Sequence, residues 1–107
     1  MDEKRYHTLA DATLARLFDA LDAAYESGAL DELELEGGIL TILAPSRRTY
    51  LLTKHAPTQQ LWYASPILGG LHFSYDATTE QWRLPDGRAL SDILRGELAG
   101  EQIEVAL

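Results

Sequence analysis

The stretch Glu32–Leu43, "ELELEGGILTIL", decides the fold of this chain. From Glu32 to Glu36, acids alternate with leucines, which is the two-residue period of a strand with one buried and one solvent-exposed face. Gly37 and Gly38 form a strong two-residue hairpin signal, and the apolar residues that follow predict the return strand. We therefore expect an antiparallel strand pair that carries a row of carboxylates on its outer face.

This row of like charge allows two interpretations. Carboxylates at positions i and i+2 of a strand lie about 7 Å apart, and each pair repels by about 0.6 kcal/mol in water. The row can be a solvated edge strand whose charge prevents edge-to-edge aggregation. It can also be a surface whose repulsion is relieved by a cation or a basic partner. Composition alone favours the solvated face, because most acidic stripes are of that kind.

A long amphipathic helix is predicted before this strand, over residues 6–26, and Ser27-Gly28 is its stop signal. At 100° per residue, six apolar side chains fall within an arc of about 80°. They are Tyr6, Ala10, Leu14, Leu17, Leu21 and Ala24. A second arc of similar width, roughly opposite, holds Asp11, Asp19, Asp22 and Glu26. Because the helix leads directly into the acidic strand, we expect the two sets of acids to form one continuous ridge.

The remaining elements are short strands joined by tight turns, followed by a helix. Strands are predicted at 49–55, 59–65, 71–76 and 80–84, and a helix over 90–98 that Gly100 closes. Since no helix separates the strands, the sheet should be largely antiparallel, with both helices on one face. The predicted fold class is α+β, a two-layer α-β-α sandwich of two helices on a five- to six-stranded sheet, in a single domain spanning 1–107.

Composition excludes several classes of protein. The chain has 107 residues, 46% of them hydrophobic and none of them cysteine, which excludes disulfides, thiolate metal sites and thiol nucleophiles. No apolar run approaches 18 residues, and the charged start "MDEKRYHTLAD" is unlike a leader, so we expect a cytosolic protein without a membrane span. Of the net charge of −8, residues 1–36 carry −7, from ten acids against three basic residues. Such a field repels nucleic acid.

Catalysis receives little support from the sequence. It contains no Gly-rich phosphate loop and no nucleophile elbow, and Ser65 and Ser74 have no evident His/Asp partners. The carboxylates are hard ligands suited to Ca²⁺, Mg²⁺, Mn²⁺ or iron, but any such site would be exposed and weak. His7 and Asp11 are four residues apart and could share a cation, although such a pair is more often a local hydrogen bond or makes no interaction at all. His55 and His72 are expected on the exposed face of the sheet.

The segment Pro57–Pro66, "PTQQLWYASP", carries a candidate contact surface. If Leu61 and Tyr63 face the helices, then Gln60, Trp62 and Ala64 face outward, and an outward Trp is typical of a protein–protein hot spot. The opposite register would bury Trp62, and periodicity alone does not separate the two. Trp82, by contrast, is expected to cap the core.

Four stretches together resemble the frataxin family, specifically its bacterial CyaY-type members, over about residues 6–98. They are "YHTLAD" (6–11), "ELEGGILTI" (34–42), "KHAPTQQLWYASPILGGLHFSYD" (54–76) and "WRLPDGRALSDILRGEL" (82–98). The Gln-Gln-Leu-Trp block is the specific part of this resemblance. The chain departs from the family pattern at Thr53 and His55, where many members have Asn and Gln. It also departs at His72 and Ser74, where mitochondrial members commonly have Arg and Asp.

The resemblance implies an iron-binding protein that docks on the cysteine desulfurase and scaffold of iron–sulfur cluster assembly, as regulator or iron supplier. Gln60 and Trp62 would form the docking contact. Fe²⁺ and Fe³⁺ would bind, exposed and weakly held, along a ridge that comprises Asp11, Asp19, Asp22, Glu26, Asp31, Glu32 and Glu34. The alternative is an autonomous ferroxidase or iron-storage protein. We expect a monomer, with metal-dependent oligomers as an alternative state.

Overall fold

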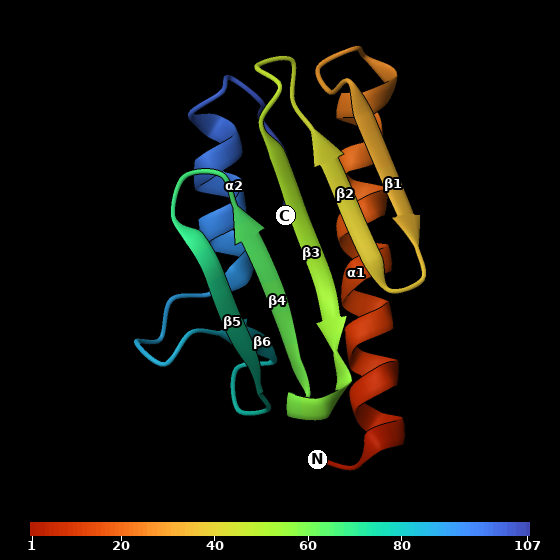
Figure 1. Cartoon of the computed structure of the whole chain (residues 1–107), viewed down its shortest axis with the longest axis vertical. Helices are drawn as coiled ribbons and strands as arrows, with labels where there is room; N and C mark the ends of the chain where they lie inside the picture. The colour runs from red at the N-terminus through yellow and green to blue at the C-terminus, as the bar shows by residue number, and fades with distance from the viewer.

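The computed structural model describes all 107 residues and places the elements in the predicted order, with six strands between two helices (Figure 1). The strands form one sheet in chain order, and every neighbouring pair is antiparallel. The elements are α1 (Glu3–Glu26), β1 (Glu32–Glu36), β2 (Ile39–Leu43), β3 (Thr49–His55), the 3₁₀ turn η1 (Ala56–Thr58), β4 (Gln60–Ser65), β5 (Gly69–Asp76), β6 (Gln81–Arg83) and α2 (Leu90–Ala99).

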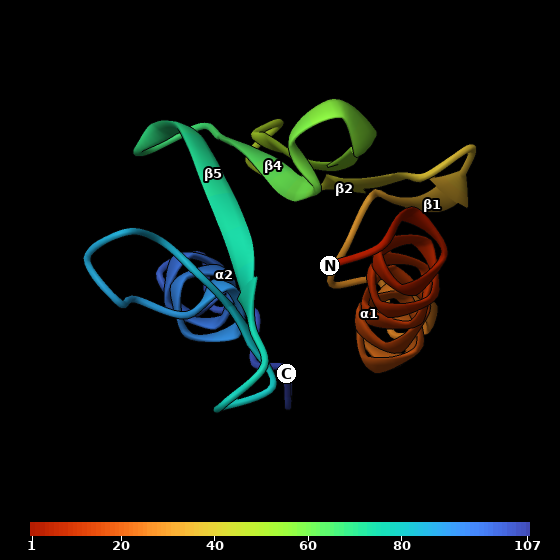
Figure 2. The same cartoon turned by 90° about the horizontal axis from the view of Figure 1, so that it is seen from below.

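Both helices cover the same face of the sheet, as Figure 2 shows. Helix α1 packs against β1 and β2, and α2 packs against β6 at the other side of the sheet. The C-terminal end of the chain lies between the two helices in Figure 2, and Ile103 of this segment is buried. The predicted α+β two-layer sandwich is confirmed, and one face of the sheet has no covering element.

Helix α1 begins one turn earlier than its apolar period indicated, because Asp2 caps it. The Asp2 side chain accepts a hydrogen bond from the Arg5 backbone N–H at 2.7 Å, which satisfies one of the free donors of the first turn. The helix ends at Glu26, with Ser27 as its C-cap, as predicted. All six residues of its predicted apolar stripe are buried.

The Gly37-Gly38 hairpin forms as predicted. Gly37 and Gly38 have φ values of +59° and +77°, and a tight hairpin of this kind requires positive φ at both central residues. The resulting register pairs Glu34 with Thr41 and Glu36 with Ile39. The two glycines therefore determine which face of β1 carries the acids.

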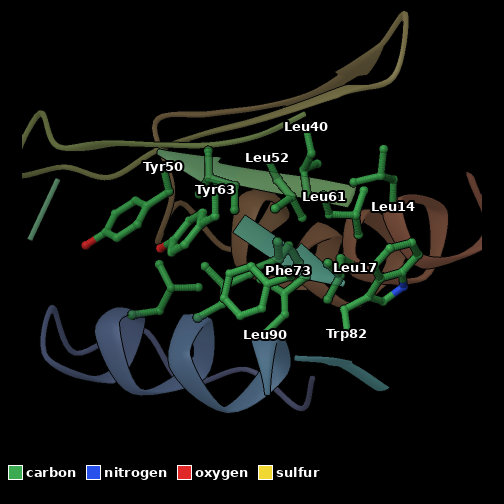
Figure 3. Close-up of a cluster of buried hydrophobic side chains, with 14 of the residues drawn as sticks. Leu14, Leu17, Leu40, Tyr50, Leu52, Leu61, Tyr63, Phe73, Trp82 and Leu90 are labelled. Carbon is green, nitrogen blue, oxygen red and sulfur yellow. The ribbon is translucent and has the colours of Figure 1, made fainter. Parts of the chain in front are cut away.

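The hydrophobic core lies between the sheet and the two helices (Figure 3). Leu14 and Leu17 of α1 meet Leu52 and Leu61 of the sheet. Trp82 is only 3% exposed, and its Nε1 donates a 2.9 Å hydrogen bond to Thr13 Oγ1. The prediction that this tryptophan belongs to the core is confirmed.

Tyrosine hydroxyls and carboxylates of the C-terminal segment form a polar boundary at one end of the core. Tyr63 donates a 2.5 Å hydrogen bond to Glu97, which also accepts from Ser65, and Tyr50 donates to Glu101. Burial, followed by the hydrogen bond to its carboxylate partner, raises the pKa of each tyrosine well above its ordinary value. Both phenols therefore stay protonated and act as donors.

No helix of the chain combines the length and apolar character needed to cross a membrane.

Candidate metal and partner surfaces

Strand β1 is the edge of the sheet and presents three carboxylates to solvent. Glu32, Glu34 and Glu36 are exposed, while Leu33 and Leu35 are half-buried against the core. None of the three acids has an ion-pair partner within the protein. The alternation is confirmed, and its outer side is an uncompensated row of negative charge.

Repulsion within this row is visible at its central residue. Hydrogen bonding to Glu36 and the charge of Glu36, ahead of the contributions of Glu32, raise the pKa of the Glu34 carboxyl above its ordinary value. Glu36 is therefore the stronger neighbour of Glu34, although our predicted metal set omitted it. The position of Glu36 in the alternating pattern was the sequence signal that could have added it to the predicted metal-binding residues.

Helix α1, which packs against β1 (Figures 1 and 2), carries further acids. Asp19 and Glu26 are exposed, Asp22 is half-buried, and none of them is ion-paired. However, no three potential metal ligands of the chain converge on one point. The acids form a dispersed surface rather than a closed coordination site. We call Asp19, Asp22, Glu26, Glu32, Glu34 and Glu36 the acidic edge.

Two acids of the predicted ridge already have a cation from the protein itself. Lys54 Nζ lies 2.7 Å from Asp11 Oδ1, and Arg47 Nη1 lies 3.1 Å from Asp31 Oδ2. A cationic ligand would have to compete with these side chains at Asp11 and Asp31. The structure thus divides the seven predicted carboxylates into two that are paired and five that are unpaired.

The structure does not bring His7 and Asp11 together around a common site. His7 Nε2 lies 3.9 Å from Glu3 Oε1, and its ring meets the edge of Tyr6 at 5.1 Å between centroids. Since Asp11 is bound to Lys54 instead, the structure shows neither a shared site nor a hydrogen bond between His7 and Asp11.

Trp62 lies on the open face of the sheet, which settles the register that periodicity left undecided. Leu61 and Tyr63 are buried, whereas Trp62 is half-buried between His55 and His72. The imidazole centroids lie 3.5 Å and 4.1 Å from the indole, and the rings are within 10° and 9° of parallel. Both histidines occupy the open face, as predicted.

Polar side chains fix the orientation of this aromatic stack. Trp62 Nε1 donates a 2.9 Å hydrogen bond to Gln60 Oε1, and Gln60 Nε2 donates to Ser74 Oγ at 3.2 Å. His55 Nδ1 lies 2.7 Å from Thr58 Oγ1. The side chains of Gln60 and Trp62 are therefore joined by a hydrogen bond on the open face of the sheet. The histidines on either side were not part of the predicted docking contact. The cross-strand pairing of Trp62 with His72 adds one of them, and β3 adds the other, since His55 pairs with Gln60.

The chain matches the family model described as "Frataxin-like domain" over residues 1–104. It is 38% identical over 108 residues to the Iron-sulfur cluster assembly protein CyaY of Pseudomonas paraeruginosa, covering 97% of this chain and 96% of the relative. It spans about half of the matched mitochondrial frataxins, 52% of the Dictyostelium discoideum protein and 55% of the Saccharomyces cerevisiae protein.

Two solved structures share the fold. Frataxin from Psychromonas ingrahamii superposes with a TM-score of 0.83 at 19% identity, over 99% of this chain and 96% of that one. Trimeric frataxin of the yeast Saccharomyces cerevisiae, complexed with ferrous iron, superposes with a TM-score of 0.76 at 32% identity, over 89% and 85%. The match to the family model over nearly the whole chain, together with these identities, shows that the chain belongs to the frataxin family.

Proposed function

We propose that this protein acts in iron–sulfur cluster assembly, as a regulator of the cysteine desulfurase and scaffold or as their iron supplier. Its bacterial relative of nearly equal length carries the name of an iron–sulfur cluster assembly protein, and the yeast relative is a complex with ferrous iron. In this proposal, iron is a cargo that binds at the acidic edge. The desulfurase–scaffold complex docks on the open face of the sheet at Gln60 and Trp62.

The observation that carries the proposal is the unpaired carboxylate row of β1. Three acids repel one another without any internal cation, so a bound cation relieves a repulsion that is already present in the free protein. The donors are carboxylate oxygens, hard ligands that suit iron, and the chain has no thiolate that would favour softer metals. The donor set therefore fits iron that is loaded and released easily.

The open face of the sheet supports the docking half of the proposal. Trp62 is held rigidly by two stacked rings and by Gln60, so little side-chain freedom remains to be lost on binding. A pre-oriented, half-buried Trp with a polar neighbour has the character of an interface hot spot. A basic surface on the partner would in addition be attracted by the acidic edge.

The ferroxidase alternative is supported by no feature of the structure. Efficient oxidation of Fe²⁺ needs several ligands that hold the metal in a defined arrangement. Here no three candidate ligands converge. The dispersed edge fits transient binding, so the cluster-assembly role is the one that we propose.

The proposal can be tested by an anaerobic titration of Fe²⁺, with Co²⁺ as a surrogate, followed by amide NMR with and without a purified desulfurase and scaffold. We expect metal-induced changes within residues 19–36, and desulfurase-induced changes around Gln60 and Trp62. Glu104→Gln removes an exposed and unpaired acid outside residues 19–36. As the control for net charge, this variant should show the same metal-induced changes as the parent chain. Metal-induced changes confined to His55 and His72 would contradict the metal assignment. Unaltered amides on the open face in the presence of the desulfurase and scaffold would contradict the docking assignment.

A further inference from the structure

A polar pocket of about 460 Å³ lies between α1, β6 and the start of α2. Its walls include one arginine from each of these elements, Arg16, Arg83 and Arg95. These are three of only nine basic residues in a chain of net charge −8. On α1, Arg16 lies about 100° around the helix from the middle of the predicted acid arc. The pocket is therefore distinct from the acidic edge.

The three guanidinium groups differ in the hydrogen bonds and ion pairs that they make within the protein. Arg83 is fixed by hydrogen bonds to Thr79 Oγ1 at 3.0 Å and to the Gly87 carbonyl at 2.6 Å, and its Nε lies 3.5 Å from Asp76 Oδ2. Arg95 donates to Asp92 at 2.6 Å. Arg16 alone makes neither an ion pair nor a side-chain hydrogen bond, and it is an exposed residue that lines the pocket. The planar donor fork of arginine matches a phosphate or carboxylate group.

The start of α2 adds donors to the same wall. Its N-cap residue is Ala89, so no side chain caps the helix. The first N–H groups of a helix have no acceptor within the helix and favour an anion at that end. Ala89 and Ser91 both line the pocket, so the start of α2 forms part of the same wall as the arginines.

A second cavity of about 230 Å³ adjoins the polar pocket. Four residues line both cavities, namely Arg16, Glu80, Gln81 and Ser91, and the walls of the second one include Leu9, Tyr75 and Trp82. Together they offer a cationic end and an apolar, aromatic end within one depression. Glu80 and Asp92 also line the polar pocket, so the side chains of its lining residues, three arginines against two acids, carry one net positive charge. This charge suits a single phosphate group better than a polyphosphate.

From this arrangement we infer that the depression is a binding site for a small organic phosphate monoester. The phosphate lies at Arg16 and the start of α2, and the apolar part lies toward Tyr75. Inorganic phosphate would use the same cationic end but would leave the aromatic end empty. It should therefore bind more weakly than an ester that carries a flat apolar group.

The test is an amide NMR titration of the full chain with phenyl phosphate, inorganic phosphate and phenol, at a constant ionic strength set with sodium chloride. Phenyl phosphate should shift amides at Arg16, at 80–83 and at 91–95. Inorganic phosphate should shift the same amides at concentrations several-fold higher, and phenol alone should not shift the amides of the cationic end. Phenyl phosphate binding no tighter than inorganic phosphate would overturn the assignment to an organic ester.

A matched pair of variants on α1 tests the role of the unpaired arginine. Arg16→Gln should weaken phenyl phosphate binding at least tenfold, whereas Arg5→Gln, an exposed arginine outside both cavities, should leave it unchanged. Both positions are exposed, so thermal melting should show both variants folded. Equal binding by Arg16→Gln and the parent chain would overturn the site. Shifts spread over exposed basic residues throughout the chain would identify an adventitious anion only and would overturn it too.

Discussion

Lys54 Nζ in β3 lies 2.7 Å from Asp11 Oδ1 in α1, so a cation of the protein itself neutralises the first acid of the predicted iron-binding ridge. The Lys54 side chain is only 17% exposed, which limits its exchange with solvent ions. The repulsion that a metal ion could relieve is therefore concentrated in β1 and in the C-terminal half of α1.

This pairing predicts a ranking of the acids in metal binding. Glu32→Gln combined with Glu34→Gln should weaken Co²⁺ or Fe²⁺ binding by about tenfold, equivalent to about 1.4 kcal/mol. Asp11→Asn should have a much smaller effect, because Asp11 is already paired with Lys54. Calorimetric or NMR titration of the variants under anaerobic conditions measures this difference. A larger loss for Asp11→Asn would mean that the metal displaces Lys54.

The raised pKa of Glu34 predicts that Glu34→Gln stabilises the metal-free protein near pH 7 and low salt. Because Glu36, followed by Glu32, disfavours the ionised form of Glu34 in the folded state, the folded pKa lies above the unfolded one. The stability linked to this proton is fully present below the unfolded pKa and is lost as the pH rises through the folded pKa.

The melting temperature of Glu34→Gln relative to the parent should therefore be higher at pH 7, and the difference should disappear below about pH 4. It should also shrink in high salt, because this carboxylate is fully exposed and screened. A lower melting temperature at pH 7 would show instead that Glu34 is a satisfied structural group. Glu104→Gln again serves as the control for net charge.

The two tryptophans should respond differently to truncation. Trp82 is buried, so Trp82→Ala should cost about 3–5 kcal/mol of unfolding free energy. Trp62 contacts mainly His55 and His72 on the open face, so Trp62→Ala should cost about 1–2 kcal/mol while weakening the binding of the desulfurase and scaffold. Urea unfolding and a binding assay separate these effects. Full partner affinity in a folded Trp62→Ala variant would eliminate the docking role.

The boundary between the core and α2 depends on the Tyr63 hydroxyl. Tyr63→Phe removes the 2.5 Å hydrogen bond to Glu97 and leaves that carboxylate with Ser65 alone. A hydrogen bond to a charged group contributes about 1.5–3 kcal/mol, so we expect a loss of that size in urea unfolding at neutral pH. Tyr25→Phe, at an exposed tyrosine, should change stability by less than about 0.5 kcal/mol. Equal effects in the two variants would refute the role of this bond.

The elements that the sequence predicted correctly are those with a local physical cause. The apolar stripe of α1 follows the helical period, and the acids of β1 follow the period of two. The hairpin follows from two glycines that tolerate positive φ. The bounds that were missed include the first turn of α1, because the Asp2 cap extends the helix beyond its apolar stripe, and the first two residues of β5, which begins at Gly69.

The tertiary structure alone decided which side of β4 is buried and which acids are free. Alternation in β4 allows either face to be inner, and Trp62 lies outward because both helices cover the other face. The His55–Trp62–His72 stack depends on the pairing of three strands. Lys54 reaches Asp11 across 43 positions of the chain, and three arginines meet at one pocket from three separate elements. Such contacts depend on how layers pack and how strands align, which no local period of the sequence encodes.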